Sequence, residues 1–160
     1  MAKRRLVIGW FTFTCSEDST ILFIELLNQN YFRWKELVEF RHCKPLKSDN
    51  VMGPFDVAFI EGAISTKREE EEVRRIRERS TKLVAVGSCA CTGMPAGQRN
   101  AFNPETMESI RPFLERFQLR EKVVPVKDIV KVDESLPGCP MVPAQFVALL
   151  EKLLEEFKVG

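Results

Sequence analysis

The sequence predicts one α/β domain with a mainly parallel sheet and helices on both faces. Short runs of β-branched and aromatic residues alternate with amphipathic segments, which is typical of βαβ units. Leu83–Val86 is almost continuously apolar, as expected of a strand that is covered on both faces. The 160 residues, 44% of them hydrophobic, show no repeat or low-complexity linker, so we expect residues 1–160 to form a single domain.

The first half of the chain contains three predicted strands and one helix. Leu6–Thr14 is rich in β-branched and aromatic residues and predicts a strand. Ser16–Ser19 then supplies residues that favour a helix start, and the apolar spacing from Ile21 to Leu27 predicts a buried helix face. Leu37–Phe40 is a weaker strand candidate, whereas Asp56–Glu61 is a strong one that ends at a glycine.

The second half begins with a charged helix. Thr66–Glu69 has the spacing of a capping box, and the acidic and basic residues that follow predict a solvated face. Glu108–Phe117 and Val142–Phe157 have helical patterns. Val123–Val126 predicts an edge or irregular strand, because Pro125 cannot donate a hydrogen bond to a sheet.

Charge and composition exclude several classes of protein. The 24 basic residues nearly balance the 23 acidic ones, so we expect neither nucleic-acid binding nor attraction to a membrane surface. No apolar run is long enough for membrane insertion, and Leu6–Trp10 is too short for a secretory core, so we expect a cytoplasmic protein. Phosphate-loop and dinucleotide-binding glycine motifs are absent.

Three of the five cysteines follow turn-forming residues at predicted strand ends or loops. Cys15 follows the first strand, Cys89 follows Leu83–Val86, and Cys139 lies in a Pro-Gly-Cys-Pro segment. The carboxyl ends of parallel strands share one edge of a sheet, so Cys15 and Cys89 should lie on that edge. Each cysteine alone is more simply explained as a small core residue, but together the three favour an iron–sulfur site.

These segments resemble a known family. The chain resembles the small subunits of nickel–iron hydrogenases and the homologous cluster-bearing subunit of respiratory complex I. The resemblance is carried by four segments: the cysteine after the first strand, Glu61–Ala63, Gly87–Ala90 and Pro137–Pro140. The resemblance extends from about Leu6 to Leu150. It implies a flavodoxin-like three-layer fold and one iron–sulfur cluster, [4Fe–4S] in type, beside the active site of a large subunit.

The resemblance assigns Cys15, Cys89 and Cys139 to three ligand positions. The family's second cysteine, in Cys-x-x-Cys, is replaced here by Asp18, and the tandem cysteines of the complex I subunit are absent, which favours the hydrogenase branch. Asp18 is therefore our predicted fourth ligand of the cluster. Cys91, a three-iron cluster, and a water or partner ligand are alternatives, and Asp18 could instead cap the following helix.

Other polar residues are weaker candidates. Glu17 could relay protons, pair across an interface or simply stabilise a helix start. Glu61 could face a partner or cap the Gly62–Ala63 turn. His42 and Cys43 are adjacent, but nothing else in the sequence has the spacing of a zinc site.

The resemblance predicts an oxidoreductase subunit that is not catalytic alone. Its cluster would pass electrons between a [NiFe] hydrogenase large subunit and further electron-transfer subunits. We expect those subunits to supply the further clusters, because this sequence has no C-terminal cysteine-rich extension. The equivalent subunit of a complex I-like enzyme is the nearest alternative. Two others are a cluster-free, flavodoxin-like interaction module and a thiol redox enzyme that uses Cys89 and Cys91.

Overall fold

The computed structural model describes residues 3–160 and contains a central parallel sheet of five strands in the order β2-β1-β3-β5-β7. Every neighbouring pair is parallel. If only the strands of this sheet are counted, the order is 2-1-3-4-5, which is the flavodoxin-like order. The predicted fold class is therefore confirmed. The strands are β1 (Leu6–Thr12), β2 (Val38–Cys43), β3 (Phe55–Glu61), β5 (Ser80–Val86) and β7 (Glu134–Leu136).

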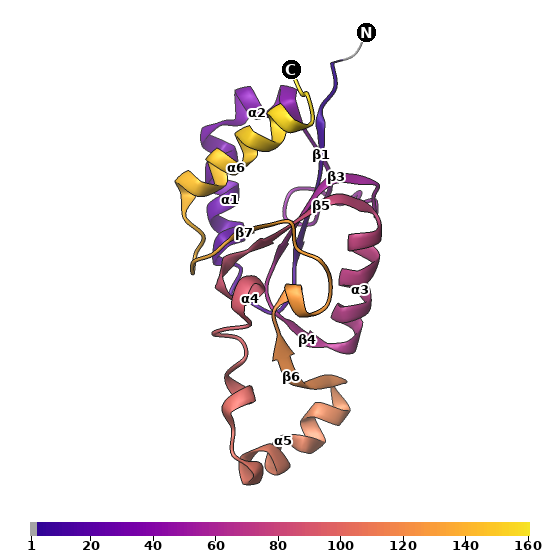
Figure 1. Cartoon of the computed structure of the whole chain (residues 1–160), viewed down its shortest axis with the longest axis vertical. Coiled ribbons are helices and arrows are strands. Elements are labelled where there is room, and N and C mark those ends of the chain that lie inside the picture. Colours follow the sequence, from indigo (N-terminus) through magenta and orange to yellow (C-terminus); the bar gives the residue numbers. More distant parts are fainter. Residues whose placement is uncertain (1–2) are drawn as a thin grey trace.

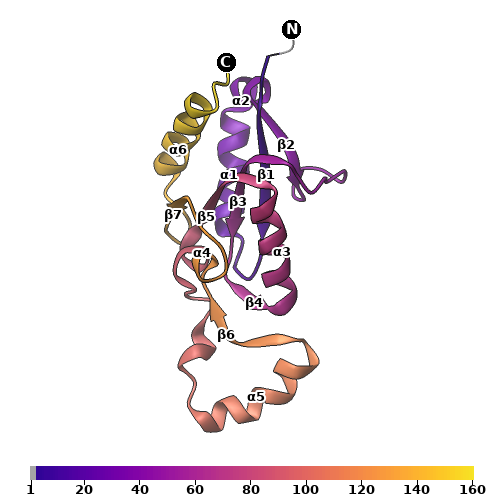
Figure 2. The same cartoon turned by 45° about the vertical axis from the view of Figure 1, so that its right-hand side comes forward.

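Helices cover both faces of the sheet (Figures 1 and 2). Alternate residues of a strand point to opposite faces, so β3 sends Val57 and Phe59 into one core and Ala58 and Ile60 into the other. The first core also holds α1, α2 and α6, and the second holds α3 and α4. These helices are α1 (Asp18–Gln29), α2 (Tyr31–Leu37), α3 (Lys67–Glu78), α4 (Gly87–Thr92) and α6 (Pro143–Glu156).

The predicted elements are found with shifted ends. The first strand stops at Thr12, and Thr14 instead forms an isolated antiparallel bridge with Ala63. The capping box is present, with Thr66 accepting a hydrogen bond from the Glu69 N–H group. No helix in residues 3–160 is long and apolar enough to span a membrane.

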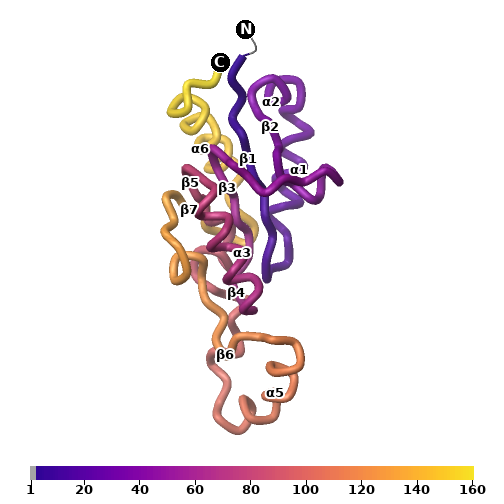
Figure 3. The backbone as a smooth tube through the Cα atoms, turned by 90° about the vertical axis from the view of Figure 1, so that its right-hand side faces the viewer, coloured from indigo at the N-terminus to yellow at the C-terminus, as the bar shows by residue number. Residues whose placement is uncertain are grey.

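Residues 93–125, here called the arm, leave the sheet and return to it (Figure 3). In all views the arm projects from the end of the molecule opposite the two termini (Figures 1–3). Its last strand pairs antiparallel with β4 outside the main sheet, which accounts for the irregular strand expected near Pro125. The elements concerned are β4 (Ile64–Thr66), η1 (Gln98–Ala101), α5 (Pro104–Arg116) and β6 (Leu119–Val124), and η2 (Val126–Asp128) follows.

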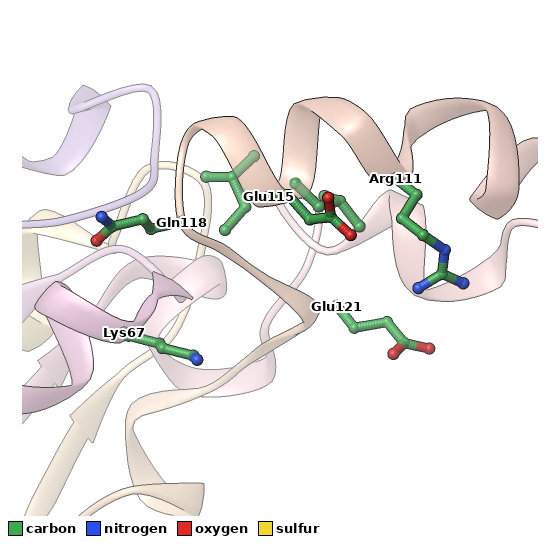
Figure 4. Close-up of a pocket in the computed structure, with 7 residues that line it drawn as sticks. Lys67, Arg111, Glu115, Gln118 and Glu121 are labelled. Atoms are coloured by element: carbon green, nitrogen blue, oxygen red, sulfur yellow. The ribbon is translucent and has the colours of Figure 1, made fainter.

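Side chains of η1 hold the base of the arm. Asn100 makes two hydrogen bonds with the backbone of Val123, at 2.7 and 2.8 Å, and Arg99 donates to the carbonyl oxygens of Ser65 and Arg120. Beyond this base, α5 and β6 enclose a hollow that is also lined by Lys67 from the start of α3 (Figure 4). Its lining is aliphatic, amide and charged, without a cysteine or histidine, so it offers no group for redox chemistry.

Candidate functional site

The three predicted cysteines converge at the carboxyl edge of the sheet. Cys15 follows β1, Cys89 lies in α4 immediately after β5, and Cys139 follows β7. Because these strands are parallel, their carboxyl ends meet at one edge, where ligands of open α/β sheets bind. The three cysteines line one hollow, and Asp18 and Glu61 line the same hollow. Residues far apart in the sequence are thus brought together as expected.

Hydrogen bonds tie the loops of this site to one another. The Ser88 N–H group donates to the Gly138 carbonyl at 2.8 Å, which joins the Cys89 and Cys139 segments. The Met141 N–H group donates to the Ser19 hydroxyl at 3.0 Å, which joins the Cys139 segment to α1. Gly87 lies where these segments meet, with φ of +80°, and a Cβ there would lie 3.2 Å from the Ser19 hydroxyl oxygen. Glycine therefore suits this junction in both conformation and size.

Asp18 lies beside the cysteines. It is the first residue of α1, and its Oδ2 accepts a hydrogen bond from the Cys139 Sγ at 3.0 Å. The helix cap is Glu17, which is exposed, has φ of +61° and makes no capping side-chain bond. Asp18 is therefore not the N-cap residue that the sequence offered as an alternative. Its carboxylate faces the cysteine hollow.

Cys91 points away from this hollow. Its Sγ donates to the Ala85 carbonyl at 3.6 Å, and its side chain packs against the core on the α3 face. Cys89 instead packs with Ala63 and Val123, near Cys15. Both thiols are free. This placement disfavours Cys91 as the fourth ligand and gives no support to a redox pair of Cys89 and Cys91.

Glu61 holds the start of α1 from the end of β3. The side chain is 1% exposed and accepts hydrogen bonds from the N–H groups of Ser19 and Thr20, both at 3.0 Å, and from the Thr20 hydroxyl. Burial raises the pKa of the Glu61 carboxyl despite these bonds. Both expectations for Glu61 were wrong: it neither faces outward toward a partner nor caps the Gly62–Ala63 turn. Its partners lie about forty residues earlier in the chain, so no local pattern indicated them.

His42 and Cys43 lie outside the cysteine hollow. His42 stacks on Phe11 with the ring centroids 4.2 Å apart, and its Nδ1 lies 3.3 Å from the Trp10 carbonyl oxygen. Cys43 is fully buried in the core on the α1 face. Both side chains are accounted for by packing, in agreement with the absence of zinc-site spacing.

Two thiols of the site, those of Cys15 and Cys139, have raised pKa values. Burial raises the pKa of Cys15 to about 12, and the charge of Glu61 adds to the shift. The hydrogen bond to Asp18, together with its charge, raises the pKa of Cys139. Thiolate is the form that binds metal, so a positively charged centre between these groups would reverse this preference.

The donor set fits a cluster better than a single ion. Within residues 3–160, no three His, Cys, Asp or Glu side chains are close enough to hold one metal ion. A [4Fe–4S] cluster takes four protein ligands distributed over four irons, and so needs donors spread around a larger volume. Three thiols and two carboxylates, those of Asp18 and Glu61, line the hollow. Cys15 and Cys89 also line an adjoining, more open hollow with Pro95 and Ala96 of the arm.

A family model for the 20 kDa subunit of NADH:ubiquinone oxidoreductase matches residues 18–153. This chain belongs to that family. The delta subunit of sulfhydrogenase 2 from Pyrococcus furiosus is 32% identical over 129 residues, covering 79% of this chain and 51% of the relative. The delta subunit of the NAD-reducing hydrogenase HoxS from Cupriavidus necator is 30% identical over 100 residues, covering 52% and 48%. The chain spans about half or less of the length of these curated relatives.

Solved structures agree with this membership. A chain of the NAD+-reducing [NiFe]-hydrogenase in the H2-reduced state superposes with a TM-score of 0.82 and 27% identity, covering 96% of this chain and 93% of that chain. A chain of the Ni-Fe-Se hydrogenase from Desulfomicrobium baculatum gives a TM-score of 0.59 at 19% identity, covering 98% and 66%, and shows the fold alone. The resemblance seen in the sequence is confirmed, and it extends to hydrogenase subunits as well as to the complex I family.

Proposed function

We propose that this chain is the electron-transfer small subunit of a [NiFe] hydrogenase and holds one [4Fe–4S] cluster. The proposed ligands are Cys15, Asp18, Cys89 and Cys139. The observation that carries the proposal is that these four residues, which come from three separate segments of the chain, line one hollow at the carboxyl edge of the sheet. Membership of a family of respiratory and hydrogenase subunits supports the same conclusion.

The chain's own residues build the environment of the cluster. When bound, the cluster supplies one-electron transfer. The buried side chain of Val86 limits the access of water from the sheet side, and Glu61 fixes the helix that carries Asp18. A carboxylate oxygen is a harder ligand than a thiolate, so Asp18 would give the cluster a potential and lability different from those of a four-cysteine site.

The proposed partners are a large subunit with the nickel–iron centre and further electron-transfer subunits. The relatives are named as subunits of hydrogenases, and the missing tandem cysteines favour the hydrogenase branch over the complex I branch. Within residues 3–160 no set of donors resembles a nickel site, so hydrogen chemistry would belong to the partner. We propose the cytoplasm as the compartment, where reduced thiols are available for metal.

Iron and acid-labile sulfide counting after anaerobic purification tests the cluster. We expect about four irons and four sulfides per chain and an EPR signal on reduction. A folded, colourless, iron-free chain that also resists reconstitution would refute the cluster and leave the interaction module. Co-purification with a chain that carries paired Cys-x-x-Cys motifs at both ends would support the nickel–iron partner.

A further inference from the structure

Glu69 makes more contacts than its capping box requires. Its Oε2 accepts hydrogen bonds from the N–H groups of Ser65 and Thr66, at 2.7 and 3.0 Å, and from the Ser65 hydroxyl at 3.0 Å. These bonds complete the start of α3. The other oxygen, Oε1, reaches a different part of the chain and accepts a hydrogen bond from the Thr14 hydroxyl at 2.9 Å.

Thr14 immediately precedes Cys15 and is held on two sides. Its backbone forms an antiparallel bridge with Ala63, with N–H···O distances of 3.2 and 2.9 Å. Its hydroxyl lies 2.5 Å from the Ser65 hydroxyl as well as bonding to Glu69. The two segments approach so closely that a Cβ on Gly62 would lie 2.9 Å from the Thr14 nitrogen. The position of the Cys15 backbone therefore depends on contacts with the segment that leads into α3.

The far end of the same loop is fixed by a second carboxylate. Glu61 accepts hydrogen bonds from the N–H groups of Ser19 and Thr20, directly after Asp18. The segment that carries Cys15 and Asp18 thus runs between two acidic side chains that come from other elements. Each carboxylate accepts several bonds, and hydrogen bonds to a charged acceptor are the stronger ones.

We infer that Glu69 is a positioning residue for Cys15, acting through the Thr14 hydroxyl to set the place of that thiol at the cluster. The inference rests on the proposed function, because it concerns the geometry of a bound cluster. Glu69 has a second, separable task in the capping box. The charged carboxylate serves both tasks, since one oxygen caps α3 and the other holds Thr14.

The test compares variants of the full chain, reconstituted anaerobically with iron and sulfide. Glu69→Gln and Thr14→Val should each release iron to a chelator about tenfold faster than the wild type, as expected for loss of one charge-assisted hydrogen bond. Both should also shift or broaden the EPR signal of the reduced cluster. Thr14→Ser keeps the hydroxyl and should restore both properties. The double variant should be no worse than either single one, because the two residues act through one contact.

Two matched variants separate positioning from stability. Thr66→Ala weakens the cap of α3 but leaves the Thr14 contact, and Glu71→Gln removes the same charge from an exposed site on the same helix. Both should keep the wild-type EPR signal and iron release. If Glu69→Gln does not fold, Thr14→Val carries the test, because it leaves the capping box intact.

The outcomes distinguish the inference from the proposed function. A wild-type chain that takes up no iron refutes the proposed function. If the wild type binds a cluster but Glu69→Gln and Thr14→Val have the same EPR signal and the same rate of iron release as the wild type, only the role of Glu69 is refuted. Equal effects of Glu69→Gln and Thr66→Ala would also refute it, because they would reduce Glu69 to a helix cap.

Discussion

Replacement of Glu61 by alanine should destabilise the apoprotein by about 2–3 kcal/mol. The N-cap residue of α1, Glu17, makes no capping side-chain bond, and Glu61 of β3 instead accepts from the amides of Ser19 and Thr20. Loss of a helix N-cap costs about 1 kcal/mol. A buried donor left without a partner costs about 1–3 kcal/mol more, and here the Thr20 amide and the Thr20 hydroxyl are affected, whereas the Ser19 amide keeps a hydrogen bond to Asp18 Oδ1 at 2.8 Å. The net loss of stability is smaller than the sum of these costs because burial of the Glu61 carboxylate is itself unfavourable, and this burial also raises its pKa.

Urea denaturation of the metal-free chain under reducing conditions measures this effect. Glu61→Gln keeps one carbonyl oxygen as an acceptor, so its stability should lie between those of the wild type and Glu61→Ala. Glu17→Gln is the matched control, because Glu17 is exposed and makes no capping bond, and its change should stay within about 0.5 kcal/mol. A Glu61→Ala protein as stable as this control would show that Glu61 does not support α1.

The remaining predictions concern ligand identity and pH. Asp18→Cys should keep about four irons and shift the reduction potential, whereas Asp18→Ala should lose iron or give a three-iron EPR signal; unchanged spectra in both would exclude Asp18 from the site. Cys91→Ser should bind as much iron as the wild type and Cys89→Ser much less, and the reverse result would contradict the ligand assignment. Burial raises the pKa of Asp133, but the hydrogen bonds from the Leu83 N–H group and from Arg77 outweigh it, so the pKa lies below the ordinary 3.8. The stability that Asp133 adds is therefore present above pH 3.8 and is lost as the pH falls through the lowered pKa of the folded protein. On acid titration, the free energy of unfolding should fall less in Asp133→Asn than in the wild type.

The sequence was sufficient to predict the sheet and the meeting of the cysteines. Strong apolar strands such as Leu83–Val86 carry a local signal, and the rule that parallel strands end at one edge converts that signal into a position in space. The helix over Pro143–Glu156 and the Thr66–Glu69 capping box were also predicted, because period and capping residues are local features. The resemblance supplied Asp18, which composition alone would have left as a helix-start residue.

Contacts between distant segments could not be predicted in this way. Glu61 and Glu69 are ordinary acidic residues in the sequence, and their partners Thr20 and Thr14 lie 41 and 55 residues away. Two of the three residues of the strand Glu134–Leu136 are polar, so it lacks a strand pattern and exists through its pairing with β5. The helix and the irregular strand of the arm were expected, but the pairing of that strand with β4 outside the main sheet was not, because no local pattern indicates it.

The geometry of the site is a property of the whole fold and not of a local motif. A Cys-x-x-Cys loop would place two thiols through short-range backbone geometry, but here the segment from Cys15 to Asp18 offers one thiol and one carboxylate. Both ends of that segment are fixed by side chains of other elements, Glu69 before it and Glu61 after it. The Cys139 segment in turn bonds to α1 and to the Cys89 segment. The segments that carry Cys15, Cys89 and Cys139 are therefore positioned by contacts with other elements of the fold, and not by a second cysteine at residue 18.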